Sequence, residues 1–209
     1  DVAKESGRLV LLDSNFKTIV AACEEGRLIF SNIKKVVAYI LSNSFVEIFL
    51  IFGAFVFNFP APLTIVQILW IHLICDGPPD IVLGFEPKEK GIMDENPKRL
   101  KKESILSGSS KFLIFSISFI IGIMALFLFW YFNKTTGNID LARTMVFASL
   151  ATVDLVYVFS FKSLQRPIIK DENFFKNKYL FLAIIYGFIL TFTAIYVPFF
   201  SKALKTVPL

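Results

Sequence analysis

Five apolar segments, each about 20 residues long, constrain this chain more than any other feature of its sequence. A helix of that length crosses roughly 30 Å of hydrocarbon. The segments are continuous rather than alternating in polarity, which argues against a transmembrane β-barrel. We expect spans at 33–57, 63–85, 112–132, 144–161 and 179–200. With 55% hydrophobic residues and 25 Phe, the sequence predicts an all-α polytopic membrane protein, a bundle of about five transmembrane helices.

The first 27 residues differ from the rest, because they are polar and mixed in charge. The short apolar run 9–12 predicts a buried strand, and Asp13 or Ser14 is expected to cap a helix over residues 16–23. A strand and a helix are too little to form a core alone. Residues 1–27 are therefore expected to be a short α/β tail, the C-terminal end of a cytoplasmic domain.

A long first helix is expected to join this tail to the membrane domain at 28–209. The first span can extend back in helical form through Lys34 and Lys35 to about Leu28, which makes one rod. No run of basic residues alternates with stacking aromatic residues, so nucleic-acid binding is not expected.

The positions of Lys and Arg predict the orientation in the membrane. Residues 1–35, 86–111 and 162–178 contain six, seven and five of them, whereas 133–143 and the tail after Ser201 contain two each. Basic residues concentrate on the cytoplasmic side. We therefore expect a multi-pass protein of the cell membrane, in contact with the lipid bilayer, with its N-terminus in the cytoplasm.

Ionisable residues inside the apolar segments point to a site, because each costs about 2.5–3.5 kcal/mol at membrane depth. Glu47 lies in the first span, with Asn43 and Ser44 four and three residues before it and so on the same helix face. The second span carries further ionisable groups, His72, Cys75 and Asp76, and the fourth carries Asp154.

Three carboxylates from three spans suggest one cation site. The Gly77-Pro78-Pro79 sequence predicts a discontinuous second helix, because proline cannot donate a backbone hydrogen bond and so frees carbonyl oxygens. Interrupted helices form ion sites at the middle of membranes. Carboxylate and carbonyl oxygens are what a hard cation such as Ca²⁺ prefers.

Each of these residues has a plainer alternative. Asp154 can be a protonated, hydrogen-bonded acid, and His72 a neutral imidazole that holds a neighbouring helix. Cys75 is more typical of a small packing residue than of a ligand, as cysteine is often buried. Asp80, one turn after Asp76, faces either the site or a cytoplasmic vestibule. Cys23 and Cys75 lie in a polar and an apolar segment, so a disulfide is not expected.

Two long stretches, residues 1–35 and CDGPPDIVLGFEPKEKGIMDENPK (75–98), resemble the C-terminal part of P-type cation-transporting ATPases of the calcium-pump-like type II group. There the family pattern is close to TDGLPA, then LGFEP, then IM-x-x-P-P, of which Pro97 keeps the second proline. The second hundred residues are similar mainly in hydropathy and order. The resemblance implies that the five spans are helices five to nine of ten, and a further helix is expected after SKALKTVPL.

The resemblance also implies a set of metal ligands. The residues at the family's ligand positions are Ser44, Glu47, His72, Cys75, Asp76 and Asp154. The main acids are kept, whereas Ser44 and His72 replace asparagines and Cys75 replaces a threonine. Imidazole and thiol are softer ligands, which leaves the ion open between Ca²⁺ and another cation. His72 also suits a proton counter-ion.

The function implied is the C-terminal membrane domain of an ATP-driven pump that exports Ca²⁺ or a related cation. Mg²⁺ and ATP would bind the upstream actuator, nucleotide-binding and phosphorylation parts, since DKTGT, TGD and GDG are absent here. This chain alone is not expected to hydrolyse ATP. The alternative is a non-enzymatic membrane subunit or remnant that binds cations or assembles with a partner. A complete secondary transporter is disfavoured, because the halves show no inverted repeat.

Overall fold

The computed structural model describes residues 15–88, 91–94, 105–163 and 176–209. Within these ranges it contains helices and no strand. Five of the helices are long and apolar enough to cross a membrane, which confirms the all-α polytopic prediction. The strand expected at 9–12 lies outside the described residues.

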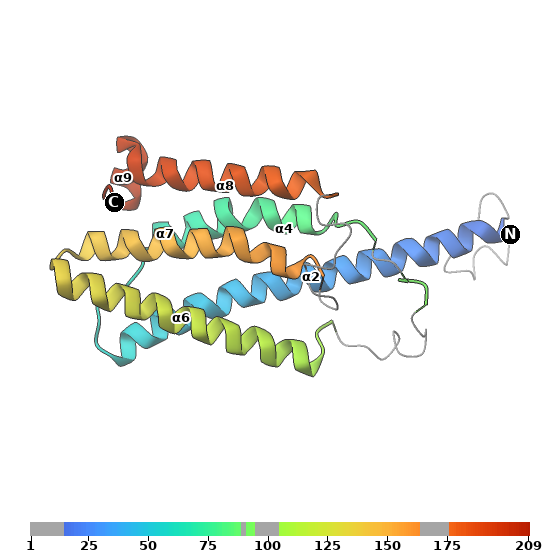
Figure 1. The fold of residues 1–209 in the computed structure, drawn as a ribbon, viewed down its shortest axis with the longest axis horizontal. Helices are drawn as coiled ribbons and strands as arrows, with labels where there is room; N and C mark the ends of the chain where they lie inside the picture. Colours follow the sequence, from blue (N-terminus) through green and yellow to red (C-terminus); the bar gives the residue numbers. More distant parts are fainter. Residues whose placement is uncertain (1–14, 89–90, 95–104, 164–175) are drawn as a thin grey trace, which may run out of the picture.

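The first helix, α2 (Phe16–Val56), is a rod of 41 residues, or about 60 Å at 1.5 Å per residue. Figure 1 shows one end of it extending beyond the bundle towards the N-terminus. The Asn15 side chain caps the helix by accepting from the backbone N–H of Lys17 at 3.0 Å. The expected cap at Asp13 or Ser14 was therefore wrong by one or two residues.

The rod is longer than the sequence predicted, because the expected short helix and the first span are continuous. Helical residues run without a break across the expected boundary between 27 and 28. The segment contains no proline, and its apolar residues keep a helical spacing on both sides of this point.

The second span consists of three consecutive helical segments, α3 (Ile65–Trp70), the π-helix η1 (Ile71–Asp76) and α4 (Gly77–Leu83). The expected discontinuity is thus a π-helical segment between two short α-helices. The Gly77 N–H donates to the His72 carbonyl oxygen, five residues back. Pro78 and Pro79 have no N–H, so the carbonyls one turn before them lose their α-helical donors, as predicted, while the chain stays helical.

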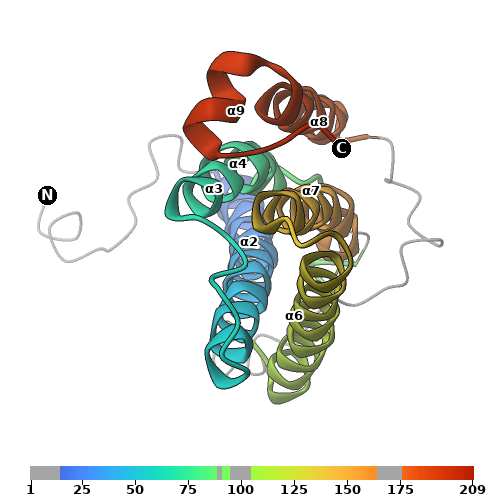
Figure 2. The ribbon, with the colours of Figure 1, turned by 90° about the vertical axis from the view of Figure 1, so that its left-hand side faces the viewer.

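The remaining elements are α6 (Gly108–Thr136), α7 (Ile139–Tyr157), the 3-10 helix η2 (Val158–Phe161), α8 (Lys178–Tyr196) and α9 (Pro198–Leu204). Figure 2 shows α2 and α6 side by side, then α3, α4 and α7, then α8 and α9. The span expected to reach residue 200 ends at Tyr196, because Val197 turns extended before Pro198.

Helix α6 packs closely along α2. A Cβ added at Gly122 would lie 2.8 Å from the Phe49 Cβ and 3.0 Å from the Val46 carbonyl oxygen, so the backbones approach closely there. The Ser118 hydroxyl donates to the Ser42 carbonyl oxygen at 2.8 Å. Small residues at such crossings are typical of helix packing in membranes.

A second contact region, the Glu86 cluster, consists of Asn32, Glu86, Lys162 and Asn177. Lys162 Nζ lies 2.8 Å from Glu86 Oε1, and both side chains are almost fully buried (1% and 3% exposed). Asn177 Nδ2 donates to Glu86 Oε2 at 2.8 Å, and Asn32 Nδ2 donates to the Glu86 carbonyl oxygen at 2.8 Å. The cluster joins α2, the end of α4, the end of η2 and the start of α8.

Candidate cation site

Three polar residues follow one another at four-residue spacing along α2: Tyr39, Asn43 and Glu47. Side chains four apart lie on one face of a helix. Tyr39 is fully buried and Asn43 is 3% exposed. This face of α2 therefore presents a hydroxyl, an amide and a carboxylate to the interior of the bundle.

The second span meets this face at η1. His72 Nε2 lies 2.8 Å from Glu47 Oε2, and His72 Nδ1 lies 3.1 Å from Asp76 Oδ2. One imidazole thus bridges the carboxylates of two spans. Its side chain is 40% exposed, against 12% for Glu47 and 7% for Asp76.

Asp76 is the most connected residue of the site. Its Oδ1 accepts from Asn43 Nδ2 at 3.0 Å and from the Tyr39 hydroxyl at 3.3 Å, while its Oδ2 faces His72. Because both oxygens are engaged, the orientation of this carboxylate is fixed from three sides.

Helix α7 reaches the same place through Asp154. The Tyr39 hydroxyl shares its hydrogen with the Asp154 carbonyl oxygen, 3.0 Å away. Asp154 is 5% exposed, and its carboxyl lies within electrostatic range of Asp76 and Glu47. The three acids on which the sequence argument rested thus come from three helices that meet at Tyr39 and Asp76.

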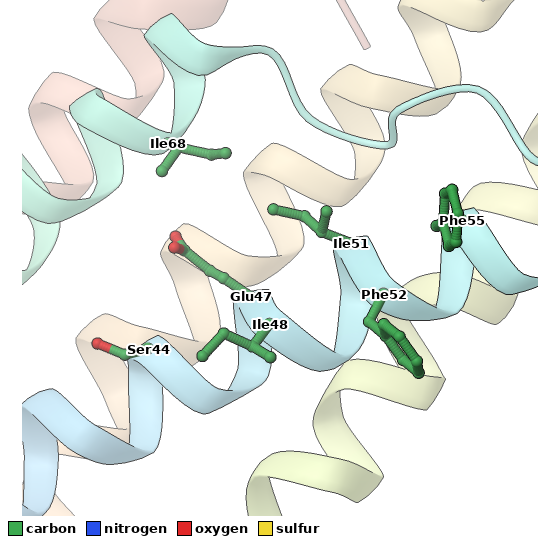
Figure 3. Close-up of a pocket in the computed structure, with 7 residues that line it drawn as sticks. All are labelled: Ser44, Glu47, Ile48, Ile51, Phe52, Phe55 and Ile68. Atoms are coloured by element: carbon green, nitrogen blue, oxygen red, sulfur yellow. The ribbon is translucent and has the colours of Figure 1, made fainter.

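On its other side, Glu47 borders a hollow of about 570 Å³. Figure 3 shows the Glu47 carboxylate and the Ser44 hydroxyl at one end of this space, with Ile51 and Phe55 further along α2 and Ile68 across it. Glu47 Oε1 is buried and has no hydrogen-bond partner among the described residues. An acceptor oxygen of a residue that lines the hollow therefore has no donor in the described part of the chain.

Two residues of the second span have different surroundings. The Cys75 thiol is fully buried and lies 3.5 Å from the Thr191 hydroxyl of α8, on the side away from α2. Asp80 is half-buried, and its Oδ1 is without a hydrogen-bond partner in the described part of the chain.

The sequence argument did not select Tyr39, which links all three helices of the site. Its position four residues before Asn43 and eight before Glu47 was a usable signal, since it places the hydroxyl on the same helix face. Among the described residues, no three side chains of His, Cys, Asp and Glu are arranged to hold a metal ion as they stand.

Comparison with known proteins gives a consistent result. The family model "Cation transporting ATPase, C-terminus" matches residues 60–209. The chain is 34% identical over 99% of its length to the calcium-transporting ATPase of Bacillus subtilis, and 37% identical over 95% to calcium-transporting ATPase 1 of Bacillus cereus. It is 36% identical over 99% to human calcium-transporting ATPase type 2C member 1. It spans less than a quarter of each, 23%, 24% and 22% respectively.

Proposed function

This chain belongs to the cation-transporting ATPase family, of which it is a C-terminal region, and we propose that it supplies the ion ligands of an ATP-driven pump that exports Ca²⁺ from the cytoplasm. The pump would lie in the cell membrane, with the N-terminal end of α2 on the cytoplasmic side. ATP, Mg²⁺ and the aspartyl-phosphate chemistry would belong to parts upstream of this chain.

One observation carries this proposal, namely the meeting of buried acids from three membrane helices. Glu47 and Asp76 approach the same imidazole at 2.8 and 3.1 Å, and the Tyr39 hydroxyl that donates to Asp76 also donates to the main-chain carbonyl of the buried Asp154. Such a concentration of acids inside apolar helices is costly and is typical of an ion pathway. Carboxylate and hydroxyl oxygens are the ligands that Ca²⁺ prefers, so the proposed ligands are Ser44, Glu47, Asp76 and Asp154.

The hollow beside Ser44 and Glu47 offers room for another membrane helix, which would supply the remaining ligands of the ion site. Apart from these two residues its lining is apolar, as expected where another membrane helix packs. In the proposed pump, upstream spans cover this hollow. They bring further oxygen ligands to a Ca²⁺ ion that is bound by Oε1 of Glu47. Ca²⁺ takes six to eight oxygen ligands, and the four proposed residues supply only four of them if each binds through a single oxygen.

Helix α2 offers the mechanical link to ATP. From Phe16 to Glu47 it is continuous, a length of about 46 Å. Arg27 Nη1 donates to the Ile92 carbonyl oxygen at 2.9 Å, and Asn32 Nδ2 donates to the Gly84 carbonyl oxygen at 3.1 Å. A tilt of the protruding end of α2 would therefore move Glu47 together with the segment after α4. This movement would shift the pump between two conformations that bind the ion with unequal affinity.

The test uses the complete pump that contains this chain. Phosphorylation from ATP is measured as a function of free Ca²⁺ for Glu47→Gln and Asp76→Asn. Both substitutions remove a charge and keep the shape, so Ca²⁺-dependent phosphorylation is expected to disappear. Asp140→Asn is the matched control, because Asp140 is 48% exposed, its carboxylate pairs with Arg143 at 3.5 Å, and it lies outside the site.

Normal Ca²⁺ dependence in Glu47→Gln and Asp76→Asn would remove the site from the proposal. Loss of phosphorylation in all three variants would indicate a general defect of the membrane domain instead, and would equally fail to support the assignment. Phosphorylation that responds to another divalent cation but not to Ca²⁺ would keep the site and change the ion.

A further inference from the structure

We infer that the His72 imidazole is a displaceable plug in the cation site: it occupies the gap between Glu47 and Asp76, and a bound cation has to move it out. This inference rests on the proposed function and makes it more specific. It assigns His72 a role opposite to that of a ligand, because the ring then lowers the affinity for the cation.

The geometry of the bridge carries the inference. The two ring nitrogens point in diverging directions, one to Glu47 Oε2 at 2.8 Å and the other to Asp76 Oδ2 at 3.1 Å. Two oxygens on one Ca²⁺ lie at most about 5 Å apart, because each Ca–O distance is about 2.3–2.6 Å. An imidazole inserted between the two oxygens holds them further apart than that. With the ring in place, these oxygens cannot bind one cation.

Differences in side-chain contacts show which group can leave. Among the described residues, the His72 ring is hydrogen-bonded only to the two carboxylates that it bridges. Asp76 is also held through its other oxygen by Asn43 and Tyr39. Rotation of the His72 side chain away from the two carboxylates would therefore open the gap and leave Asp76 oriented for a cation.

The identity of the proposed cargo favours displacement over ligation. Ca²⁺ takes oxygen ligands, so the imidazole nitrogens add nothing to its site. If His72 were instead a ligand, one nitrogen would face the metal and the other would face a carboxylate, as is usual for metal-binding histidines. In that arrangement His72 would give up only one of its two contacts with Glu47 and Asp76, and its nitrogen would suit a softer metal than Ca²⁺.

A plug reduces the measured affinity by the fraction of molecules in which the site is open. His72→Ala removes the ring, and His72→Asn shortens the side chain and offers an amide oxygen. Equilibrium binding of radioactive Ca²⁺ to the purified complete pump without ATP is therefore expected to tighten about tenfold in both variants, which corresponds to a tenfold excess of the closed form. Leu73→Ala, a 74% exposed neighbour, is the matched control and should bind as the unmodified pump does.

Weaker or unchanged Ca²⁺ binding in both His72 variants, with an unchanged number of binding sites, would overturn the inference. Parallel binding of Mn²⁺ identifies the ligand alternative, in which His72→Ala weakens Mn²⁺ more than Ca²⁺. Glu47→Gln separates this result from failure of the proposed function. If Glu47→Gln abolishes Ca²⁺ binding while His72→Ala does not tighten it, only the plug is wrong. If Glu47→Gln leaves binding intact, the site itself is wrong.

Discussion

The buried ion pair between Glu86 and Lys162 allows a quantitative prediction for stability. The two charges lie 2.8 Å apart at 3% and 1% exposure, in a region that joins four helical elements. Lys162→Met removes one charge and leaves the Glu86 carboxylate buried without its cation. Breaking a buried pair in this way costs about 3–5 kcal/mol.

The expected shift in melting temperature follows from chain size. For a domain of about 150–250 residues, each kcal/mol corresponds to about 2–4 °C, so Lys162→Met is expected to lower the melting temperature by about 10 °C. The assay is thermal unfolding of the purified 209-residue chain in detergent, followed by the fluorescence of its two tryptophans, Trp70 and Trp130.

A double substitution makes the reasoning refutable. In Lys162→Met with Glu86→Gln neither charge of the pair remains, and the amide oxygen introduced by Glu86→Gln can still accept from Asn177, so most of the lost stability should return. Glu24→Gln is the surface control, because its pair with Lys88 is 32% and 57% exposed and is screened by solvent, so its loss should not change the melting temperature. The reasoning fails if the double variant is no more stable than Lys162→Met alone.

Three further predictions follow from single contacts. Gly122→Val is expected to separate α6 from α2 and to lower the melting temperature of the chain, whereas Gly108→Ala, with nothing within 4 Å, should not change it; equal melting of the two variants would contradict the close crossing. Asn43→Ala removes the amide that orients Asp76 and should weaken Ca²⁺ binding to the complete pump about tenfold, as expected for one hydrogen bond to a charged group; unchanged binding would show that Asp76 needs no such support. Cys75→Ala should leave Ca²⁺ binding unchanged, because the thiol contacts α8; a weakened affinity would return Cys75 to the ligand set.

The spans could be predicted from the sequence because membrane insertion depends on hydropathy and length, which are local properties. The extent of α2 could not, because polarity changes near residue 28 while helical structure continues from Phe16. The polar and the apolar part of α2 meet different surroundings, but the backbone is helical in both. The end of α8 at Tyr196 followed from Pro198, a local signal that a prediction based on hydropathy alone misses.

The candidate site was predictable in its residues and not in its contacts. Helical spacing placed Asn43 on the same face of the helix as Glu47, but in the structure the Asn43 amide donates to Asp76 on another helix. The bridge through His72 likewise depends on how η1 turns against α2. The Glu86–Lys162 pair joins two segments distant in the sequence, and no periodicity in either segment indicates the other.

Crystals of the complete pump grown with Ca²⁺ give the most direct test, through anomalous diffraction from the bound ion. The proposed site predicts an anomalous peak within about 2.6 Å of carboxylate oxygens of Glu47 and Asp76, with the His72 ring rotated out of the gap between them. A peak elsewhere in the membrane domain, with His72 still bridging the two carboxylates, would contradict both the site and the plug.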